Sequence, residues 1–370
     1  MNVPFVDLRA QYKAIKSRVD PAIKRVLQSG RFIAGPECES FEQEFANYLN
    51  TKHVLGVNSG TDALILGTCA LGLKAGDEMI VPANTFYASV LAATQNGLKP
   101  VFVDIDPDDN GISISDLKKK INVRTKAIMA VHLYGQSDKI QEIQAIIKKT
   151  GRAIHLIEDA CQAHGATYDN RRVGTFGTFG TFSFYPTKNL GAYGDGGAIA
   201  TNDDKLAKKI VLEREYGQTR KYHHDKIGVN SRLDPIQAAI LTIKLSKLDA
   251  WNKKRQMLAK RYNNLLADVP DIYTPKTFEN RPSVYHLYVI RAKRRNALQG
   301  YLEGRGVITQ IHYPIPLHRQ KAFAFLNYKQ GDLPNAEMAA SEILSLPMFP
   351  ELTDSQINFV TRTIKDFTVR

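Results

Sequence analysis

The chain has 370 residues, a length that corresponds to two or three domains and is ample for a large buried core. An apolar content of 43% with 24% charged residues excludes a disordered chain. Three cysteines without a CxxC pair argue against a disulfide framework and against a zinc site. Neither a signal peptide nor a run of about 18 apolar residues is present, so we expect a soluble, cytoplasmic protein.

The formal net charge of +13 suggests a nucleic-acid partner, but its distribution weakens that interpretation. Residues 1–200 carry +2, residues 201–300 carry +11, and residues 301–370 are neutral. The basic stretch is interspersed with acidic residues and contains no helix-turn-helix or zinc motif. A basic regulatory or nucleic-acid-binding protein is therefore a remote alternative, which salt-dependent DNA binding by residues 201–300 would indicate.

In chain order, strand-like segments alternate with helical ones after a helical region at 15–50. Strands are expected at 53–57, 78–83, 100–106, 127–135 and 153–160, and helices at 61–72, 86–97 and 141–149. The strands are near-continuous apolar runs, which is typical of a mostly parallel sheet with helices on both faces. The sequence therefore predicts an α/β fold.

The pattern changes after Asp234-Pro235, which opens a helix with a capping residue and a proline at the first position. Apolar spacing predicts that this helix continues to about Val269, long enough to connect two domains. A strand at 285–292 and a helix at 296–306 then indicate a smaller α+β unit. We expect a large domain over residues 1–250 and a small C-terminal domain over residues 251–370.

Ligands of open α/β sheets bind beyond the carboxyl ends of the strands, where two candidate segments lie. Residues 58–62 follow one strand and begin a helix, whose free N–H groups suit an anion. An ordinary capped helix is the alternative. Asp159 follows another strand, where a carboxylate either caps the next turn or holds a cationic ring nitrogen.

A cluster of four aspartates could be interpreted as a metal-binding site. It comprises Asp104, Asp106, Asp108 and Asp109. Because it lies at a strand end beside Pro107, we interpret it as a solvated turn and expect no metal.

The most informative segment is 181–198, where one lysine, Lys188, lies between an aromatic strand and four glycines. A lysine is unfavourable to bury unless its charge is removed or paired. A Schiff base with an aldehyde cofactor removes that charge and fixes the cofactor covalently. The glycines allow the backbone to pass close to a planar cofactor. A surface lysine in a flexible loop is the alternative, which the flanking strands disfavour.

Seven motifs carry a family resemblance. They are NSGTDAL (58–64), PANTFYAS (82–89), EDACQAHGA (158–166), SFYPTKNLGAYGDGGAI (183–199), GVNSRLDPIQAAI (228–240), HYPIPLHRQ (312–320) and LSLPMFP (344–350). In this order the chain resembles, along nearly its whole length, the DegT/DnrJ/EryC1/StrS family of sugar-nucleotide aminotransferases that depend on pyridoxal phosphate (PLP). The resemblance implies PLP fold type I: a large domain with a mostly parallel sheet, and a small α+β C-terminal domain.

The resemblance implies roles at the cofactor. Lys188 would form the internal aldimine with pyridoxal 5′-phosphate and then act as general acid and base, and Asp159 would keep the pyridine nitrogen protonated. The other expected cofactor contacts are Gly60, Thr61 and Ser183 at the phosphate, Phe86 on the ring face, Gln162 at the ring hydroxyl, and Asn230 donated by a neighbouring subunit. A homodimer with shared active sites is therefore expected. Because position 188 is lysine rather than the histidine of dehydratase members, transamination is expected.

The resemblance also implies a substrate site. The expected contacts are Gly30, Phe32, Thr187, Arg232, His312 and Tyr313. For Arg232 a structural ion pair is an open alternative, and for His312 an interface role. We expect part of the basic excess in residues 201–300 to attract the phosphate cofactor and a nucleotide diphosphate.

The run Tyr222-His223-His224 and the HYPIPLHRQ motif resemble members that act on 3-keto nucleotide sugars. The expected reaction transfers an amino group from L-glutamate to a dTDP-3-keto-6-deoxyhexose or a UDP-3-keto sugar, as in deoxyamino sugar and O-antigen polysaccharide biosynthesis. A 4-keto-6-deoxy nucleotide sugar is the alternative substrate. Turnover without any nucleotide sugar would instead indicate a PLP enzyme acting on amino acids.

Overall fold

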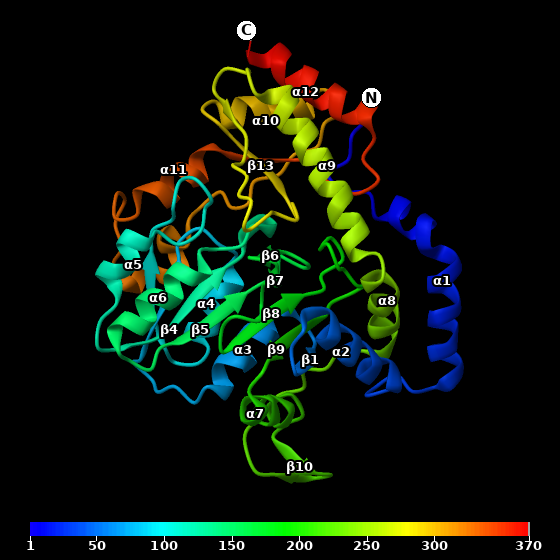
Figure 1. Ribbon diagram of the computed structural model, residues 1–370, viewed down its shortest axis with the longest axis vertical. Coiled ribbons are helices and arrows are strands. Elements are labelled where there is room, and N and C mark those ends of the chain that lie inside the picture. The colour runs from blue at the N-terminus through cyan, green and yellow to red at the C-terminus, as the bar shows by residue number, and fades with distance from the viewer. Residues whose placement is uncertain (369–370) are drawn as a thin grey trace.

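The computed structural model describes residues 1–368, and a seven-stranded sheet lies at its centre (Figure 1). The strand order is β1-β9-β8-β5-β4-β2-β3. The bounds are β1 His53–Val57, β2 Glu78–Pro82, β3 Lys99–Val103, β4 Thr125–Val131, β5 His155–Asp159, β8 Phe179–Ser183 and β9 Gly197–Thr201. Only β9 pairs antiparallel with its neighbours, whereas the other pairs are parallel. The predicted mostly parallel sheet is confirmed.

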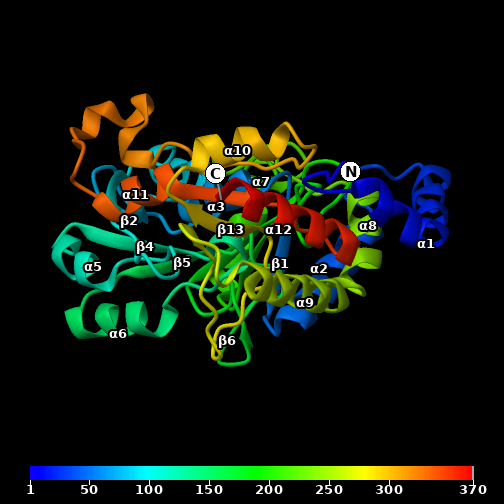
Figure 2. The same ribbon diagram turned by 90° about the horizontal axis from the view of Figure 1, so that it is seen from above.

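Both faces of this sheet are buried, which explains the near-continuous apolar strands. Successive side chains of a strand point to opposite faces. In β4, Met129 packs into the cluster formed with α3, α4 and α7, whereas Ile128 packs into the cluster formed with α2, α5 and α6. In Figure 2, α3 and α7 lie on one side of the sheet, and α2 and α6 lie on the other. The helix bounds are α2 Pro36–Leu49, α3 Gly60–Ala70, α4 Tyr87–Thr94, α5 Ile114–Lys120, α6 Ile140–Thr150 and α7 Asp204–Arg214.

A second, three-stranded sheet organises the C-terminal part of the chain. It consists of β12 Ile272–Tyr273, β13 Tyr288–Ala292 and β14 Ile343–Leu346, accompanied by helices α10 Arg295–Glu303, α11 Pro334–Glu342 and α12 Asp354–Thr368. Val3 joins this core and pairs with Val307, so the N-terminal segment lies at the same end of the molecule as α12 (Figure 1). The division of the chain after residue 250 stays a prediction.

The connection between the two sheets is not one long helix, so that prediction was wrong. It is formed by α8 Pro235–Leu245 and α9 Leu248–Leu266, separated at Ser246 and Lys247. The Ser246 hydroxyl donates to the carbonyl of Ile243, a local hydrogen bond that competes with the helical pattern. Pro235 begins α8 as predicted, whereas Asp234 makes no capping hydrogen bond with its side chain. The remaining long helix, α1 Leu8–Ser29, packs against α8 (Figure 1).

Two further hairpins complete the strands. They are β6 Thr167–Tyr168 with β7 Arg171–Arg172, and β10 Gln218–Arg220 with β11 His223–His224. The second hairpin extends beyond α7 at the lower end of Figure 1. No helix in residues 1–368 is long and apolar enough to cross a membrane.

The acidic cluster is not a solvated turn throughout, so that expectation was wrong for two of its members. Asp104 is buried and accepts the backbone N–H of Ala336 at 2.9 Å. Asp109 is buried between Lys139, at 2.8 Å, and Arg281, at 2.7 Å. The other two carboxylates are at least partly exposed. Within residues 1–368, no group of three or more His, Cys, Asp or Glu side chains is arranged to hold a metal ion.

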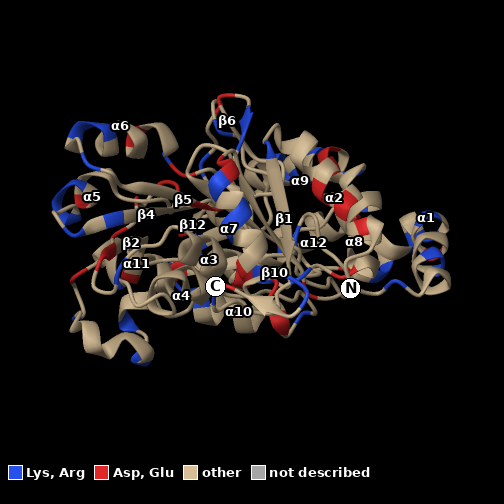
Figure 3. Cartoon of the chain, turned by 90° about the horizontal axis from the view of Figure 1, so that it is seen from below, with Lys and Arg blue, Asp and Glu red and all other residues tan. Residues whose placement is uncertain are grey.

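Some of the basic excess in residues 201–300 is structural. Lys244, Arg255, Arg281 and Arg295 are buried and donate to backbone carbonyls. Elsewhere Lys and Arg are spread over several helices, among them α1, α5, α6 and α7 (Figure 3). Buried and dispersed basic side chains therefore account for part of the net charge of +13 without a basic face of the kind that binds a nucleic-acid polymer.

Candidate active site

A cavity of about 670 Å³ lies beyond the carboxyl ends of β1, β5 and β8, where the strand-end rule places a ligand. Its size suits a cofactor together with part of a substrate. The predicted residues that line it are Gly60, Thr61, Phe86, Asp159, Gln162, Ser183, Thr187, Lys188, His312 and Tyr313. The sequence motifs that lie far apart in the chain therefore meet at one place.

The start of α3 forms an anion cradle at one end of the cavity. Ser59 caps the helix by accepting the N–H of Asp62 at 3.1 Å, which leaves the first N–H groups free for a ligand. A Cβ on Gly60 would lie 2.6 Å from the Ser183 Cβ, so a glycine is required for helix and strand to approach this closely. Together with the Thr61 and Ser183 hydroxyls, this arrangement fits a phosphate group.

Asp159, the last residue of β5, is held in a fixed orientation. Its carboxylate accepts the Ser89 hydroxyl at 2.7 Å and the N–H of Cys161 at 3.2 Å, and the residue is only 6% exposed. The Ser89 hydroxyl also bonds to Thr85 at 2.9 Å. A carboxylate fixed in a water-poor site can hold a protonated ring nitrogen. Ser89 is the last residue of the PANTFYAS motif, but its residue type alone does not predict this contact with Asp159.

Lys188 lies in the loop between β8 and β9, and its side chain borders the cavity. Its backbone N–H donates to the Tyr185 carbonyl at 2.9 Å, which fixes the turn that carries it. Within residues 1–368 no carboxylate pairs with its amine. Burial lowers the pKa of Lys188, against smaller raising effects of Cys161 and Asp159. A larger uncharged fraction makes the amine a better nucleophile toward an aldehyde.

Phe86 and Gln162 face the middle of the cavity. Phe86 is 51% exposed, and its ring centroid lies 5.6 Å from that of Tyr313. Gln162 accepts the N–H of Tyr134 at 2.8 Å and donates to the Tyr313 hydroxyl at 3.1 Å. An open aromatic face and a fixed amide are suited to a planar ring that carries a hydroxyl group.

Neutral imidazoles line the far end of the cavity. His312 is bonded through Nδ1 to the Ser345 hydroxyl at 2.8 Å, and burial, with a smaller effect of the Lys188 charge, lowers its pKa to about 4. His286, which no motif indicated, lines the same cavity, and burial followed by the Lys188 charge lowers its pKa well below the usual value. Both rings are therefore uncharged at neutral pH and can exchange hydrogen bonds with hydroxyl groups.

Four predicted site residues lie outside this cavity. Gly30 ends α1 with φ 65°, Phe32 is 48% exposed, and Asn230 is exposed. Arg232 forms an ion pair with Glu215 at 3.0 Å. No Lys or Arg from residues 201–300 borders the cavity within the described chain. The ligand roles of these residues stay predictions.

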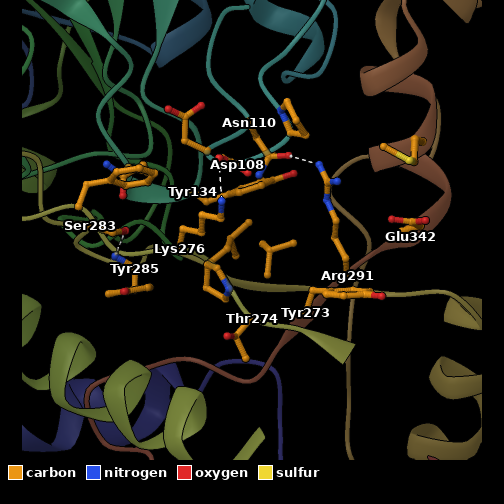
Figure 4. A pocket seen from close by; sticks show the side chains of 18 of the residues that line it. Asp108, Asn110, Tyr134, Tyr273, Thr274, Lys276, Ser283, Tyr285, Arg291 and Glu342 are labelled. Atoms are coloured by element: carbon orange, nitrogen blue, oxygen red, sulfur yellow. Dashed lines mark hydrogen bonds and ion pairs between the residues drawn. The ribbon is translucent and has the colours of Figure 1, made fainter. Parts of the chain in front are cut away.

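A second cavity, of about 410 Å³, lies behind Tyr134 and Leu287 and is drawn in Figure 4. Arg291 donates to the Asn110 side chain at 3.5 Å, and Lys276 forms an ion pair with Asp108; all four side chains line this cavity. Tyr134 connects the two cavities, because its hydroxyl donates to the His312 carbonyl. None of the predicted site residues lines this second cavity.

The fold and the site together define a pyridoxal-phosphate fold type I enzyme, and comparison with known proteins gives its family. The model of the DegT/DnrJ/EryC1/StrS aminotransferase family matches residues 13–365. The chain belongs to this family, which confirms the resemblance found in the sequence. The prediction of a sugar-nucleotide transaminase is confirmed as well.

Three relatives illustrate the range of known names. The "Pleiotropic regulatory protein" of Geobacillus stearothermophilus is 46% identical over 99% of both chains. The dTDP-3-amino-3,4,6-trideoxy-alpha-D-glucose transaminase of Streptomyces venezuelae is 44% identical over 100% of this chain and 97% of its own. The UDP-2-acetamido-2-deoxy-3-oxo-D-glucuronate aminotransferase of Pseudomonas aeruginosa is 42% identical over 97% and 98%.

Solved structures agree with the fold. The crystal structure of S. venezuelae DesV in complex with a ketimine intermediate superposes with a TM-score of 0.96 at 44% identity, covering 100% of this chain and 99% of that one. NtdA of Bacillus subtilis with bound cofactor PMP superposes with a TM-score of 0.93 at 34% identity, covering 100% and 86%. Fold type I is confirmed, and the cradle, the Asp159 carboxylate and the Lys188 amine fit the pyridoxal cofactor seen in such homologues.

Proposed function

We propose that this enzyme transfers the amino group of L-glutamate to the C3 keto carbon of a nucleotide-linked sugar. The observation that carries the proposal is that Lys188, the anion cradle of α3 and the fixed carboxylate of Asp159 all line the same cavity. The C3 position is supported by the names of the Streptomyces and Pseudomonas relatives, both of which specify an amino or oxo group at that carbon. One of these names specifies dTDP and the other UDP, so either nucleotide suits the proposal.

The residues of the cavity divide the chemistry among them. When bound, pyridoxal phosphate supplies the electron sink for the carbon that loses a proton. Lys188 Nζ would hold the cofactor covalently and, as a free amine, would accept the proton lost by the donor's α-carbon and return it on the cofactor side. Asp159 would hold the proton on the ring nitrogen, and Phe86 would cover the ring face. The free N–H groups at Gly60, with the Thr61 and Ser183 hydroxyls, bind the phosphate.

We assign the far end of the cavity to the sugar, which Thr187, His312 and Tyr313 would contact through hydrogen bonds. The remaining predicted contacts, Asn230 among them, lie outside the cavity of their own chain. A homodimer in which each subunit completes its partner's site explains this placement. Mixing Lys188→Ala with Asn230→Ala protein tests it, because hybrid dimers would regain one intact site. Activity that stays at the level of the unmixed variants would contradict sharing.

Lys188 gives the most direct test of the proposed chemistry. With PLP bound, the wild type should absorb in the visible range, and borohydride should fix the cofactor to the peptide that contains Lys188. Lys188→Ala should stay folded, lose that attachment, and lose transamination by at least about a thousandfold. A Lys188→Ala enzyme that transaminates at the wild-type rate would refute the assignment.

Two alternatives make different predictions. If the substrate is a 4-keto-6-deoxy nucleotide sugar, the amine is added at C4 instead of C3. The proposed roles of the residues at the cofactor stay the same. A regulatory role, suggested by the name of the Geobacillus relative, predicts DNA binding that weakens steeply with salt. We favour the enzyme, expect it in the cytoplasm, and expect its product to enter polysaccharide assembly.

A further inference from the structure

Lys244, in α8, is a fully buried lysine directly behind the loop that carries Lys188. Its exposed fraction is 0%, and its Nζ donates to the Gly191 carbonyl at 2.6 Å. The same Nζ lies 4.2 Å from the centroid of the Tyr193 ring. In the part of the chain that the structure describes, no carboxylate lies within 4 Å of this amine. A backbone carbonyl and an aromatic face are therefore its contacts.

A lysine in this setting is unfavourable for stability. Removing an ammonium group from water is costly, and a carbonyl with an aromatic ring offsets only part of that cost. Burial lowers the pKa of Lys244 to about 7, and the charge of Glu351 opposes this shift. Tyr193 stays neutral, because burial raises its pKa to about 12. An apolar side chain of similar length would fill the space without the desolvation cost.

The Gly191 carbonyl that Lys244 holds is mechanically connected to Lys188. A Cβ on Gly191 would lie 2.4 Å from the Pro186 carbonyl oxygen, so the two backbones are in direct contact. Pro186 lies two residues before Lys188 in the turn closed by the Lys188 N–H and the Tyr185 carbonyl. A shift of Gly191 would therefore shift the turn that directs the Lys188 side chain.

Helices α8 and α9 bind the same loop at two more points. The N–H of Tyr193 donates to Gln237 of α8 at 2.8 Å, and the Asn189 amide donates to Asn252 of α9 at 2.8 Å. These two contacts flank Gly191, and Lys244 supplies the one between them. The loop is thus fixed from behind by three side chains of the helices that connect the two sheets.

We propose that Lys244 is a positioning residue that holds the Gly191 carbonyl and thereby fixes the turn from which Lys188 enters the cavity. The proposal rests on the proposed function in one respect, the role of Lys188 as the residue that binds the cofactor. It goes beyond that function because it assigns part of the active-site geometry to a residue that touches neither substrate nor cofactor.

The test compares Lys244→Met, which keeps the length and removes the donor, with Lys247→Met, a control at an exposed lysine in the break between α8 and α9. In Lys244→Met we expect kcat to fall by about tenfold or more, with KM for donor and acceptor changed by no more than about twofold. The pH at which the visible absorption of the Lys188-bound cofactor changes should also shift. Lys247→Met should match the wild type. Lys244→Gln keeps a neutral donor and should recover part of kcat.

Stability gives a readout that does not depend on activity. The pKa of Lys244 is lowered from its ordinary value of 10.5 to about 7 in the folded state. Between pH 7 and pH 10.5 the unfolded chain therefore binds more protons than the folded one. This group therefore makes the wild type more stable as the pH rises from about 7 to 10.5. Lys244→Met should lose that slope and, at pH 7, be at least as stable as the wild type in urea unfolding.

The outcomes separate a positioning role from a structural one. Unchanged kcat and unchanged cofactor absorption in a folded Lys244→Met protein would overturn the proposal. Loss of folded protein in both the Met and Gln variants would also overturn it, because the lysine would then support the fold itself. If the wild type transaminates no nucleotide sugar, the proposed function fails, but the titration of the Lys188-bound cofactor's absorption in the wild type and in Lys244→Met still decides the role of Lys244.

Discussion

Ser89→Ala tests whether the carboxylate of Asp159 is held by its neighbours as the geometry indicates. The substitution removes one hydroxyl from a residue that is 0% exposed. Asp159 then keeps the Cys161 N–H at 3.2 Å but loses the Ser89 hydroxyl at 2.7 Å. Thr85 loses its partner at 2.9 Å as well.

The magnitude follows from the charge of the acceptor. A hydrogen bond to an ionised group contributes about 1.5–3 kcal/mol. For a chain of 370 residues, an unfolding entropy of roughly 2.1 cal/mol/K per residue converts this into a fall in Tm of about 2–4 °C. A less fixed carboxylate should also lower kcat by about tenfold, because it holds the ring nitrogen less well.

Calorimetry of the cofactor-free protein and steady-state kinetics of the loaded enzyme measure the two effects. Ser341→Ala is the matched control, since that serine is exposed and donates only to the Met338 carbonyl. It should change Tm by less than about 1 °C. If Ser89→Ala leaves both Tm and kcat at the wild-type values, the reasoning about Asp159 is refuted.

Three more predictions follow from single contacts. Gly60→Ala places a methyl group 2.6 Å from the Ser183 Cβ and should weaken PLP binding by about tenfold or more in a fluorescence titration; an unchanged Kd would show that the cradle tolerates a Cβ. Burial, followed by the charge of Asp109, raises the pKa of Asp138 to about 6, so its contribution to stability is lost as the pH rises from about 4 to 6. Relative to the wild type, the free energy of unfolding of Asp138→Asn in urea should rise by up to about 3 kcal/mol between about pH 4 and pH 6. A difference between the two proteins that stays constant over this pH range would contradict the prediction. Arg232→Ala should raise KM for the sugar by about tenfold if the residue contacts substrate, whereas an equal effect of a Glu215→Gln change would indicate that only their ion pair matters.

The strand-end rule predicted from the sequence where the candidate cavity lies. Asp159 and the start of α3 both follow buried apolar strands, and the glycines around Lys188 marked a close backbone approach. These signals are local, because each depends on residues adjacent in the chain. The individual roles required the family resemblance, since the types of side chain alone left a capped turn or a surface lysine as alternatives.

What the sequence did not reveal depends on contacts between distant segments. Ser89 contacts the Asp159 carboxylate, and His286 lines the cavity, only because segments distant in the chain pack together, which local sequence patterns do not predict. Lysine is typical of exposed helical positions, but Lys244 is buried because α8 is packed between α1 and α2. Asp104 is buried because α11 donates two N–H groups to it from the far end of the chain.

One further error came from a pattern that continued across a break. Apolar spacing runs on from α8 into α9, so the periodicity gave no sign of the interruption at Ser246. The hydrogen bond from the Ser246 hydroxyl to the Ile243 carbonyl competes with the helical pattern, and apolar spacing does not reveal such a contact.

In the proposed reaction, the C3 keto carbon of a nucleotide sugar gains an amine in the cavity around Lys188. The most direct measurement incubates the enzyme, with PLP and L-glutamate, against three separate acceptors: a dTDP-3-keto-6-deoxyhexose, dTDP-4-keto-6-deoxyglucose and a UDP-3-keto glucuronate. Mass spectrometry then detects which acceptor gains an amine. We predict amination of a 3-keto compound and loss of that product in Lys188→Ala. Amination of the 4-keto compound alone would contradict the C3 assignment, and amination of none would contradict the proposed acceptors as a class.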